Sequence, residues 1–173
     1  DQYTLTVQVS DSALTATANV IITILDVNEA PVIQDATRAI TENVAMGTHL
    51  GDPIRGSDVD NDDVLTHTIT DGNAGAGFAL HPSTGQLTVN NALDHETAPQ
   101  YTLTVQVTDG SLTDTARVTI TVLDANERPV FTSLPLTEAT EDTPYTYTIT
   151  TYDEDNGDIL TIQSNASAPA LPN

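Results

Sequence analysis

Apolar and polar residues alternate along a long stretch near the middle of the chain. Every second residue is apolar over residues 101–107, and the alternation resumes over residues 116–122 after a turn at Asp109-Gly110. A period of two over such lengths is that of a half-buried β-strand, and two such strands around a short turn form a hairpin. The pattern therefore predicts a β-hairpin over residues 101–122.

This hairpin sequence occurs twice. The stretch YTLTVQVSDSALTATANVIITILDVNEAPVI begins at Tyr3, and YTLTVQVTDGSLTDTARVTITVLDANERPVF begins at Tyr101. A second pair of similar stretches covers residues 39–70 and 138–164. Because self-similarity at a fixed spacing is typical of tandem modules, the chain is predicted to repeat a unit as long as the 98 residues from Tyr3 to Tyr101.

Shorter strand candidates lie between the two hairpins. They are centred on residues 39–40, 65–69, 78–80 and 87–89, and clusters of Gly, Asn, Asp and Pro separate them. No long periodicity of 3.6 residues is present, so helices are not expected. About seven short strands in about 100 residues are typical of an immunoglobulin-like sandwich. We therefore predict an all-β protein of Greek-key β-sandwich modules in tandem.

The two repeats set the boundaries of three segments. Residues 1–29 are predicted to be the C-terminal hairpin and linker of one module, residues 30–127 a complete module, and residues 128–173 the N-terminal half of a third. An isolated hairpin is marginally stable in water. We therefore expect the first segment to dock, to fray or to pair with a neighbouring chain.

Charge narrows the range of partners. The chain has 25 acidic residues, four arginines and no lysine, and its formal net charge is -21. Nucleic acid and anionic membrane surfaces are poor partners for it, because both bind through Lys and Arg. No apolar run approaches the roughly 18 residues of a membrane span, so membrane insertion is not expected. The absence of cysteine excludes disulfides, thiolate metal sites and thiol catalysis.

Acidic residues gather in short motifs within the complete module. These motifs are TEN at 41–43, SDVDND at 57–62, LDHE at 93–96, the turn at Asp109, and LDANERP at 123–129. Any one of them alone is what a solvated polar turn looks like. Calcium, however, takes roughly six to eight oxygen ligands, which several converging loops can supply together. The set as a whole therefore favours a Ca²⁺ site.

An EF-hand loop is an alternative type of calcium site for the acids of the SDVDND motif. The stretch DVDNDD places acids at loop positions 1, 3 and 5. Asp63 then occupies the position of the required glycine, and Ile69 that of the bidentate glutamate. An EF-hand is therefore excluded.

The order of the motifs TEN, DVD, LDHE, VTDG and DANERP resembles that of the calcium motifs of a cadherin repeat. Residues 131–173, with TEDTPYTYTI and YDEDNGD, are more similar to the cadherin-like, dystroglycan-type modules of bacterial surface or secreted proteins. The resemblance implies a β-sandwich that binds calcium at the junction between successive modules.

The same resemblance implies ligands at two junctions. At the second junction they are Glu42, Asp94 and Glu96 before the linker, Asp124, Asn126 and Glu127 in it, and Asp153 and Asp155 after it. At the first junction they are Asp26, Asn28 and Glu29 in the linker, and Asp58, Asp60 and Asp109 after it.

Some positions depart from the family pattern. Glu29 and Glu127 stand where the family has a linker Asp, and the residue after each cannot supply a side-chain oxygen. The loop after Asp60 is short, which leaves a backbone carbonyl near Asp62 as the expected ligand there. His95 is interpreted as an exposed spacer, because imidazole suits softer metals than calcium.

The sequence thus predicts a calcium-binding module of a tandem-repeat stalk or adhesin, at the cell surface or secreted, whose junctions stiffen when calcium binds. Its partners would be calcium, other modules of the same chain, and a cell-surface protein or polysaccharide. An alternative is a surface module that binds carbohydrate or protein, although the chain has no Trp. An enzyme is not expected: Asp94 and Glu96 could be drawn as a glycosidase pair, but no catalytic motif accompanies them.

Overall fold

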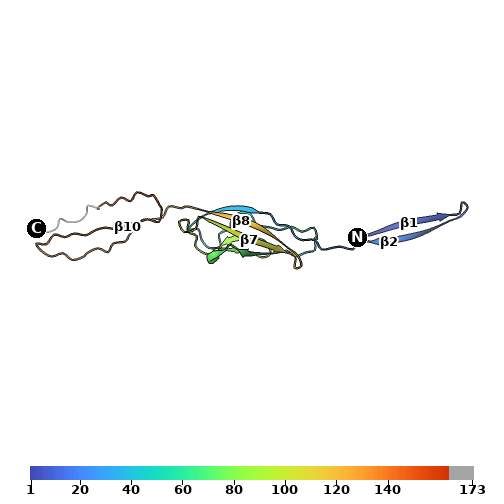
Figure 1. The fold of residues 1–173 in the computed structure, drawn as a ribbon, viewed down its shortest axis with the longest axis horizontal. Helices are drawn as coiled ribbons and strands as arrows, with labels where there is room; N and C mark the ends of the chain where they lie inside the picture. The colour runs from blue at the N-terminus through green and yellow to red at the C-terminus, as the bar shows by residue number, and fades with distance from the viewer. Residues whose placement is uncertain (164–173) are drawn as a thin grey trace.

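The computed structural model describes residues 1–163, and its strands fall in three consecutive parts of the chain (Figure 1). The first part holds β1 (Gln2–Ser10) and β2 (Thr15–Thr23). The middle part holds β3 (Ala36–Thr41), β4 (Thr66–Asp71), β5 (Phe78–Leu80), β6 (Leu87–Val89), β7 (Gln100–Thr108) and β8 (Thr113–Leu123). The last part holds β9 (Val130–Phe131) and β10 (Thr151–Tyr152). A short 3₁₀ turn, η1 (Ala74–Ala76), precedes β5.

The middle part is a β-sandwich, as predicted. Four strands form one sheet in the order β3-β8-β7-β4, in which β3 runs parallel to β8 and the other neighbours are antiparallel. Strands β5 and β6 form a second pair, and isolated bridges join Val32 to Ser57 and His49 to Thr88. Six strands and two bridges thus stand where the sequence predicts about seven strands. Strands β5 and β6 coincide with the predicted ranges.

The core of this sandwich follows the predicted alternation. The side chains of Leu103, Val105 and Val107 on β7 are fully buried, and so are those of Val118, Ile120 and Val122 on β8. Phe78, Leu87 and Val89 contribute from the opposite pair of strands to the same cluster. Apolar residues with a period of two therefore face one interior, because successive side chains of a strand point to opposite faces.

A buried histidine holds the loop that leads into the SDVDND motif. His67 on β4 is buried, its Nδ1 lies 2.9 Å from the Pro82 carbonyl oxygen, and its Nε2 accepts a hydrogen bond of 3.0 Å from the Gly56 amide. Gly56 packs so close to Val107 that a Cβ there would lie 2.7 Å from a Val107 methyl group. Only glycine fits between these two contacts, and Asp58 follows two residues later.

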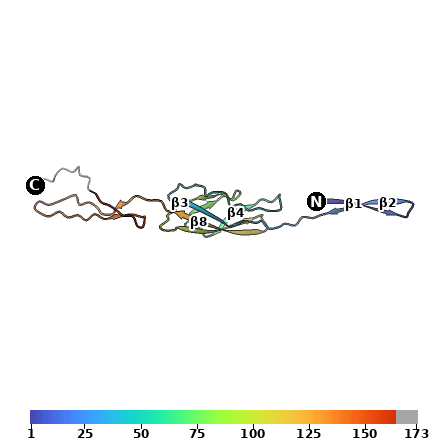
Figure 2. The same ribbon diagram turned by 90° about the horizontal axis from the view of Figure 1, so that it is seen from above.

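The N-terminal hairpin repeats the sequence of β7 and β8 but not their burial. Figures 1 and 2 show β1 and β2 extending away from the sandwich. Leu5, the counterpart of Leu103, is 53% exposed, and Tyr3 is 59% exposed although its position is in phase with the core positions. The reason is that, within residues 1–163, no second sheet covers this hairpin.

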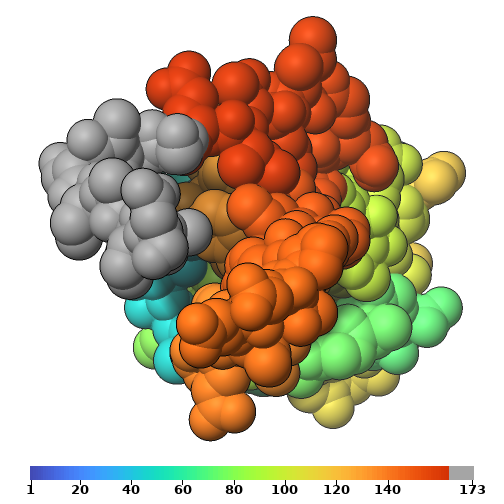
Figure 3. Space-filling model, turned by 90° about the vertical axis from the view of Figure 1, so that its left-hand side faces the viewer, coloured from blue at the N-terminus to red at the C-terminus, as the bar shows by residue number. Residues whose placement is uncertain are grey.

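The C-terminal segment has little regular structure among its described residues. Strands β9 and β10 pair over two residues each. Tyr145, which is also in phase with core positions, is 51% exposed. Viewed from this end of the molecule, the segment lies in front of the sandwich, in orange and red (Figure 3). Residues 164–173 lie outside the described range.

Across residues 1–163, no helix has the length and apolar character needed to cross a membrane.

The difference in burial between the two hairpin copies can be tested at one pair of positions. We expect Leu103→Ala to lower the free energy of unfolding by about 2–5 kcal/mol, because it empties a core site. We expect Leu5→Ala to change it by less than about 0.5 kcal/mol, because that side chain is exposed. Urea unfolding of the whole chain measures both. Equal losses would show that the hairpin buries its apolar face after all.

Candidate metal centres at the two ends of the sandwich

The parallel pairing of β3 with β8 brings two acidic motifs together. The last pair in register is Thr41 with Leu123, and the Glu42 amide donates a 3.0 Å hydrogen bond to the Leu123 carbonyl. Parallel strands end at the same edge of a sheet, so Glu42 and Asp124, each the first residue past its strand, lie side by side. We call this end of the sandwich the linker pole.

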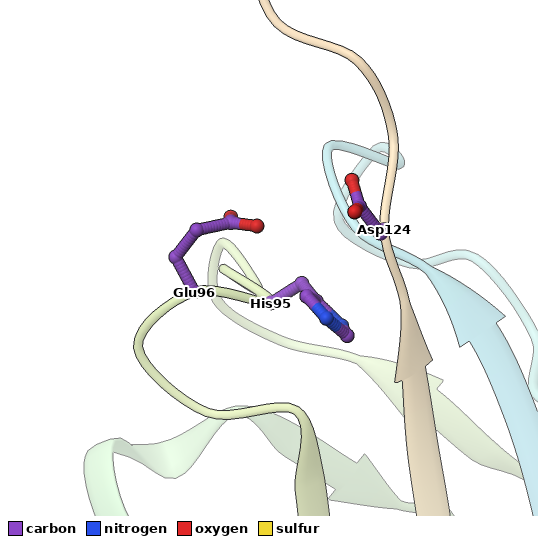
Figure 4. Close-up of side chains that lie close together, drawn as sticks. All are labelled: His95, Glu96 and Asp124. Atoms are coloured by element: carbon purple, nitrogen blue, oxygen red, sulfur yellow. The ribbon is translucent and has the colours of Figure 1, made fainter. Parts of the chain in front are cut away.

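The LDHE motif reaches the same pole from the loop before β7. Strand β7 is antiparallel to β8, so its start lies beside the end of β8, and the Val122 amide donates to the Pro99 carbonyl at 2.9 Å. Figure 4 shows His95 and Glu96 on this loop and Asp124 beyond the end of β8, with the two carboxylates facing the same space. Three separate loops thus meet at the linker pole.

Glu42 contacts both of the other loops at the linker pole. It is only 4% exposed, its Oε2 accepts a 2.6 Å hydrogen bond from the His95 amide, and its Oε1 accepts one of 2.8 Å from the Ala125 amide. Carboxylate oxygens of Glu42, Asp124 and Glu127 lie within 4.8 Å of one another, as do those of Glu42, Asp94 and Glu96. The structure therefore brings together five of the predicted ligands.

The carboxylate of Asp94 is held by hydrogen bonds within its own turn. Its two oxygens accept hydrogen bonds of 2.7 Å from the amide and from the hydroxyl of Thr97, and these bonds hold its pKa below the usual value. The carboxylate is therefore ionised and fixed in position. Each of its oxygens keeps a lone pair for a cation.

Two shielded carboxylate oxygens at the linker pole have no hydrogen-bond partner among the described residues. Oε2 of Glu96 and Oε2 of Glu127 are shielded from solvent and accept no hydrogen bond, whereas Oε1 of Glu127 accepts one from Asn43. Burial, followed by repulsion from Glu42, Asp155 and other acids, raises the pKa of Glu127 to about 7. Burial likewise raises the pKa of Glu96, with repulsion from Glu42 and Asp124 adding to it. Shielding a charged oxygen without a donor is unfavourable, and a cation beside it would compensate that cost.

The C-terminal segment contacts the linker pole through one hydrogen bond. The Glu127 amide donates to Oδ2 of Asp155 at 2.8 Å, and the Asp155 amide donates to Oδ1 of Asp153 at 3.2 Å. In the linker itself, the Asn126 amide group donates to the Glu127 carbonyl at 2.8 Å. The predicted ligands on both sides of the linker are thus joined by a continuous set of contacts.

The opposite pole repeats this arrangement with the first linker. The Glu29 amide donates to Oδ2 of Asp60 at 3.0 Å, and the Asp60 amide donates to Oδ1 of Asp58 at 3.1 Å. The Asn28 side chain donates to the Glu29 carbonyl at 3.0 Å and to Oδ2 of Asp109 at 2.9 Å. Three of these four bonds have counterparts at the second linker, and among the described residues the bond from Asn28 to Asp109 has none. We call this end the turn pole.

One residue at the turn pole was not among the predicted ligands. Oxygens of Asp58, Asp63 and Asp109 lie within 4.8 Å of one another. The pKa of Asp63 is raised, first by burial and then by repulsion from Asp109, Asp60, Asp58 and Asp26.

The C-terminal segment also contains an acidic residue that was not among the predicted ligands. Asp153, Asp155 and Asp158 form a similar group, and Asp158 was not predicted either. The shared spacing of three acids in DVDNDD and DEDNGD was the signal in the sequence that could have found Asp63 and Asp158.

The interpretation of His95 as an exposed spacer is wrong. Its side chain is half-buried, and its Nδ1 lies 2.7 Å from the Val122 carbonyl oxygen. This hydrogen bond, followed by attraction to Glu96, Asp124 and Glu42, raises the pKa of the imidazole. Because Nδ1 is engaged by this carbonyl, the donors that remain at the linker pole are mainly carboxylate oxygens, the type that calcium prefers.

Relatives among known proteins agree with these observations. The chain is 33% identical over 141 residues to human protocadherin Fat 1, covering 75% of this chain and 3% of that protein. It is 40% identical over 147 residues to mouse protocadherin Fat 4, covering 77% of this chain and 3% of that protein. The chain therefore spans a small fraction of the length of these relatives. Both are mammalian proteins, and they lend no support to a bacterial source.

Solved structures show the same architecture. Cadherin domains 1–4 of protocadherin gamma B7 match with a TM-score of 0.65 and 29% identity, covering 91% of this chain and 41% of that one. Mouse cadherin-23 domains EC22–24 match in fold with a TM-score of 0.66 and 24% identity, covering 90% of this chain and 54% of that one. Tandem cadherin domains thus match this chain well beyond its complete sandwich.

The family model described as the cadherin domain matches residues 37–123, which run from β3 to the end of β8. The chain therefore belongs to the cadherin family, whose repeats are extracellular, non-enzymatic adhesion modules that typically bind calcium.

Proposed function

We propose that this chain is part of a tandem array of cadherin modules in which calcium, bound at both linkers, stiffens the junctions between successive modules. In this proposal residues 1–29 end one module, residues 30–127 form a complete one, and residues 128–173 begin the next. The observation that carries the proposal is the meeting of acids from three segments at the second linker. Glu42 belongs to the sandwich, Asp124 and Glu127 to the linker, and Asp155 to the following segment.

The electrostatics support a divalent cation at each pole. The carboxylates lie close enough to repel one another, and shielded oxygens of Asp58, Asp63, Glu96 and Glu127 have no hydrogen-bond partner. A divalent ion is often the largest local charge in such a site, and it reverses the effect of this crowding. Carboxylates, side-chain amides and backbone carbonyls are also the ligands that calcium takes.

The proposed ligand set covers both junctions. At the second junction it comprises Glu42, Asp94, Glu96, Asp124, Asn126, Glu127, Asp153 and Asp155. At the first it comprises Asp26, Asn28, Glu29, Asp58, Asp60 and Asp109.

Stiffening follows from where these ligands lie. Residues 124–129 form no regular secondary structure, and few hydrogen bonds cross them. Such linkers allow modules to move relative to one another. With calcium bound, bending the linker would pull ligands of one segment away from an ion held by another. Extracellular calcium modules bind in the range of about 0.1–1 mM, so the array would be stiff outside a cell.

For the array as a whole, a cell-surface protein or a polysaccharide is the proposed class of partner. Junctions of fixed geometry would present the side faces of successive modules in a constant orientation, which favours binding at several points at once.

Calcium should change both the binding heat and the shape of the chain. We expect calorimetry to detect calcium binding near millimolar levels or tighter, and small-angle scattering to show a narrower, more extended distribution of distances with calcium than with chelator. Glu42→Gln should weaken binding at the second junction by about tenfold or more, because it removes a charge that faces both groups of acids.

The matched control is Asp52→Asn, which removes one negative charge from an exposed site away from both poles. This variant should bind calcium as the wild type does. No binding by the wild type, or equal losses in both variants, would contradict the proposal.

Binding at the second junction should also depend on pH. The pKa of Glu127 rises from an ordinary 4.5 to about 7 in the folded protein. Because the folded-state value is the higher one, a bound proton stabilises the metal-free junction below about pH 4.5, and this contribution is lost as the pH rises through about 7. Calcium requires the ionised carboxylate, so its affinity should rise about tenfold between pH 6 and pH 8, with release of a proton at the lower pH.

Calorimetry in buffers of different ionisation enthalpy measures this proton release. Glu127→Gln should abolish it, and Glu29→Gln, at the corresponding position of the first linker, should leave it in place. A binding heat that is the same in every buffer at pH 6 would rule out this role for Glu127.

A further inference from the structure

We propose that the carboxylate of Asp63 binds the cation at the turn pole directly, where the short loop was expected to offer only a backbone carbonyl, and that Asp158 does the same after the second linker. This inference rests on the proposed function, since it assigns a further ligand to a site of that kind. A charged carboxylate would then take the place of a neutral carbonyl among the ligands at the turn pole.

The loop geometry directs Asp63 toward the pole. Residues 58–65 connect the Val32–Ser57 bridge to β4, and a turn in which the Asp63 amide donates to the Asp60 carbonyl at 3.1 Å closes the loop. Beyond this turn, an oxygen of Asp63 lies within 4.8 Å of oxygens of Asp58 and Asp109. Asp62, its neighbour, is exposed and does not belong to this group.

The oxygens of the three acids differ in whether they accept hydrogen bonds. Oδ1 of Asp109 accepts two amide hydrogen bonds of 2.6 Å within its own turn, and its Oδ2 accepts one from Asn28. Oδ2 of Asp58 and Oδ2 of Asp63, in contrast, are shielded from solvent and have no hydrogen-bond partner. Shielding a charged oxygen without a donor is unfavourable unless a cation occupies the space beside it.

The repeat supplies an independent observation. Asp153, Asp155 and Asp158 follow the same spacing as Asp58, Asp60 and Asp63, and their oxygens also lie within 4.8 Å of one another. The two loops share an asparagine after the second acid and differ at the other two positions between these acids. The third acid of each loop is thus placed with the others in two separate segments.

The three carboxylates at the turn pole come from one segment of the chain. Asp58, Asp63 and Asp109 all belong to the segment after the first linker, so three carboxylates of one module face the ion without help from the preceding one. Affinity in calcium sites depends on the number of charged ligands and on rigidity. The turn pole should therefore hold its ion more tightly than a loop with a carbonyl at this position would.

The test compares Asp63→Ala with Asp62→Ala in the whole chain by calcium calorimetry. The two variants lose the same charge at adjacent positions, and both keep their backbone carbonyls. We expect Asp63→Ala to weaken one class of sites by at least about tenfold, the scale on which the loss of an indirect metal contact acts. Asp62→Ala should bind as the wild type does.

If the wild type binds calcium and the two variants bind alike, the inference is wrong and the carbonyl near Asp62 remains the ligand. If the wild type itself binds no calcium, the proposed function fails instead, so the two failures are distinguishable.

Thermal unfolding in chelator separates a ligand from a structural residue. Asp63→Ala should unfold at the wild-type temperature or above it, because the change removes a like charge from a crowded group. A lower unfolding temperature in chelator would show that Asp63 supports the loop itself, which would overturn its role as a ligand.

Discussion

The parallel pairing of β3 with β8 is the constraint on which the linker pole depends. It sets Thr41 opposite Leu123, so the residues that follow, Glu42 and Asp124, leave the sheet at the same edge. An antiparallel neighbour at this position would have carried the TEN motif to the other end of β8. With 11 residues at roughly 3.4 Å each, that end is about 35 Å away. The antiparallel pairing of β7 with β8 then adds the LDHE loop to the linker pole and Asp109 to the turn pole.

The sandwich holds together a group of charges that repel one another. Its apolar interior, formed by β7, β8 and the β5–β6 pair, fixes the strand ends in place, and the loops must follow. The result is a set of shielded oxygens without donors, at Asp58, Asp63, Glu96 and Glu127. Hydrophobic burial thereby supplies the free energy that keeps these carboxylates together, and the proposed calcium would meet a site that is already assembled. Such preorganisation lowers the entropy lost on binding.

The two linkers use one local design. In each, a Glu amide donates to the second acid of the next DxD motif, and an Asn side chain donates to the carbonyl of that Glu. Every one of these bonds lies within a linker or between a linker and the segment that follows it. The segment after each linker thus binds that linker, while Glu42 binds the second linker from the preceding side through the Ala125 amide. The distance between the poles far exceeds the Debye length of about 8 Å at physiological salt, so calcium ions at the two proposed sites should bind nearly independently.

Much of this protein follows from its sequence alone. Alternation with a period of two specifies the strands, because side chains on a strand must divide between two faces. The repeat from Tyr3 to Tyr101 predicts tandem modules, and the order of the acidic motifs indicates the family and its typical ion.

Tertiary structure decided which side chains are buried and which groups they contact, even where two stretches have nearly identical sequences. Leu5 and Leu103 have the same sequence neighbours, yet one is 53% exposed and the other is fully buried, because only β7 and β8 have a second sheet to cover them. His95 looked like an exposed spacer, but its ring is oriented by a carbonyl on β8, 27 residues away in sequence. From the sequence, Asp63 was considered only as a misfit in an EF-hand loop, whereas the folded loop brings its carboxylate together with those of Asp58 and Asp109. Burial and ligand geometry depend on contacts between residues far apart in the chain, and a local pattern does not contain them.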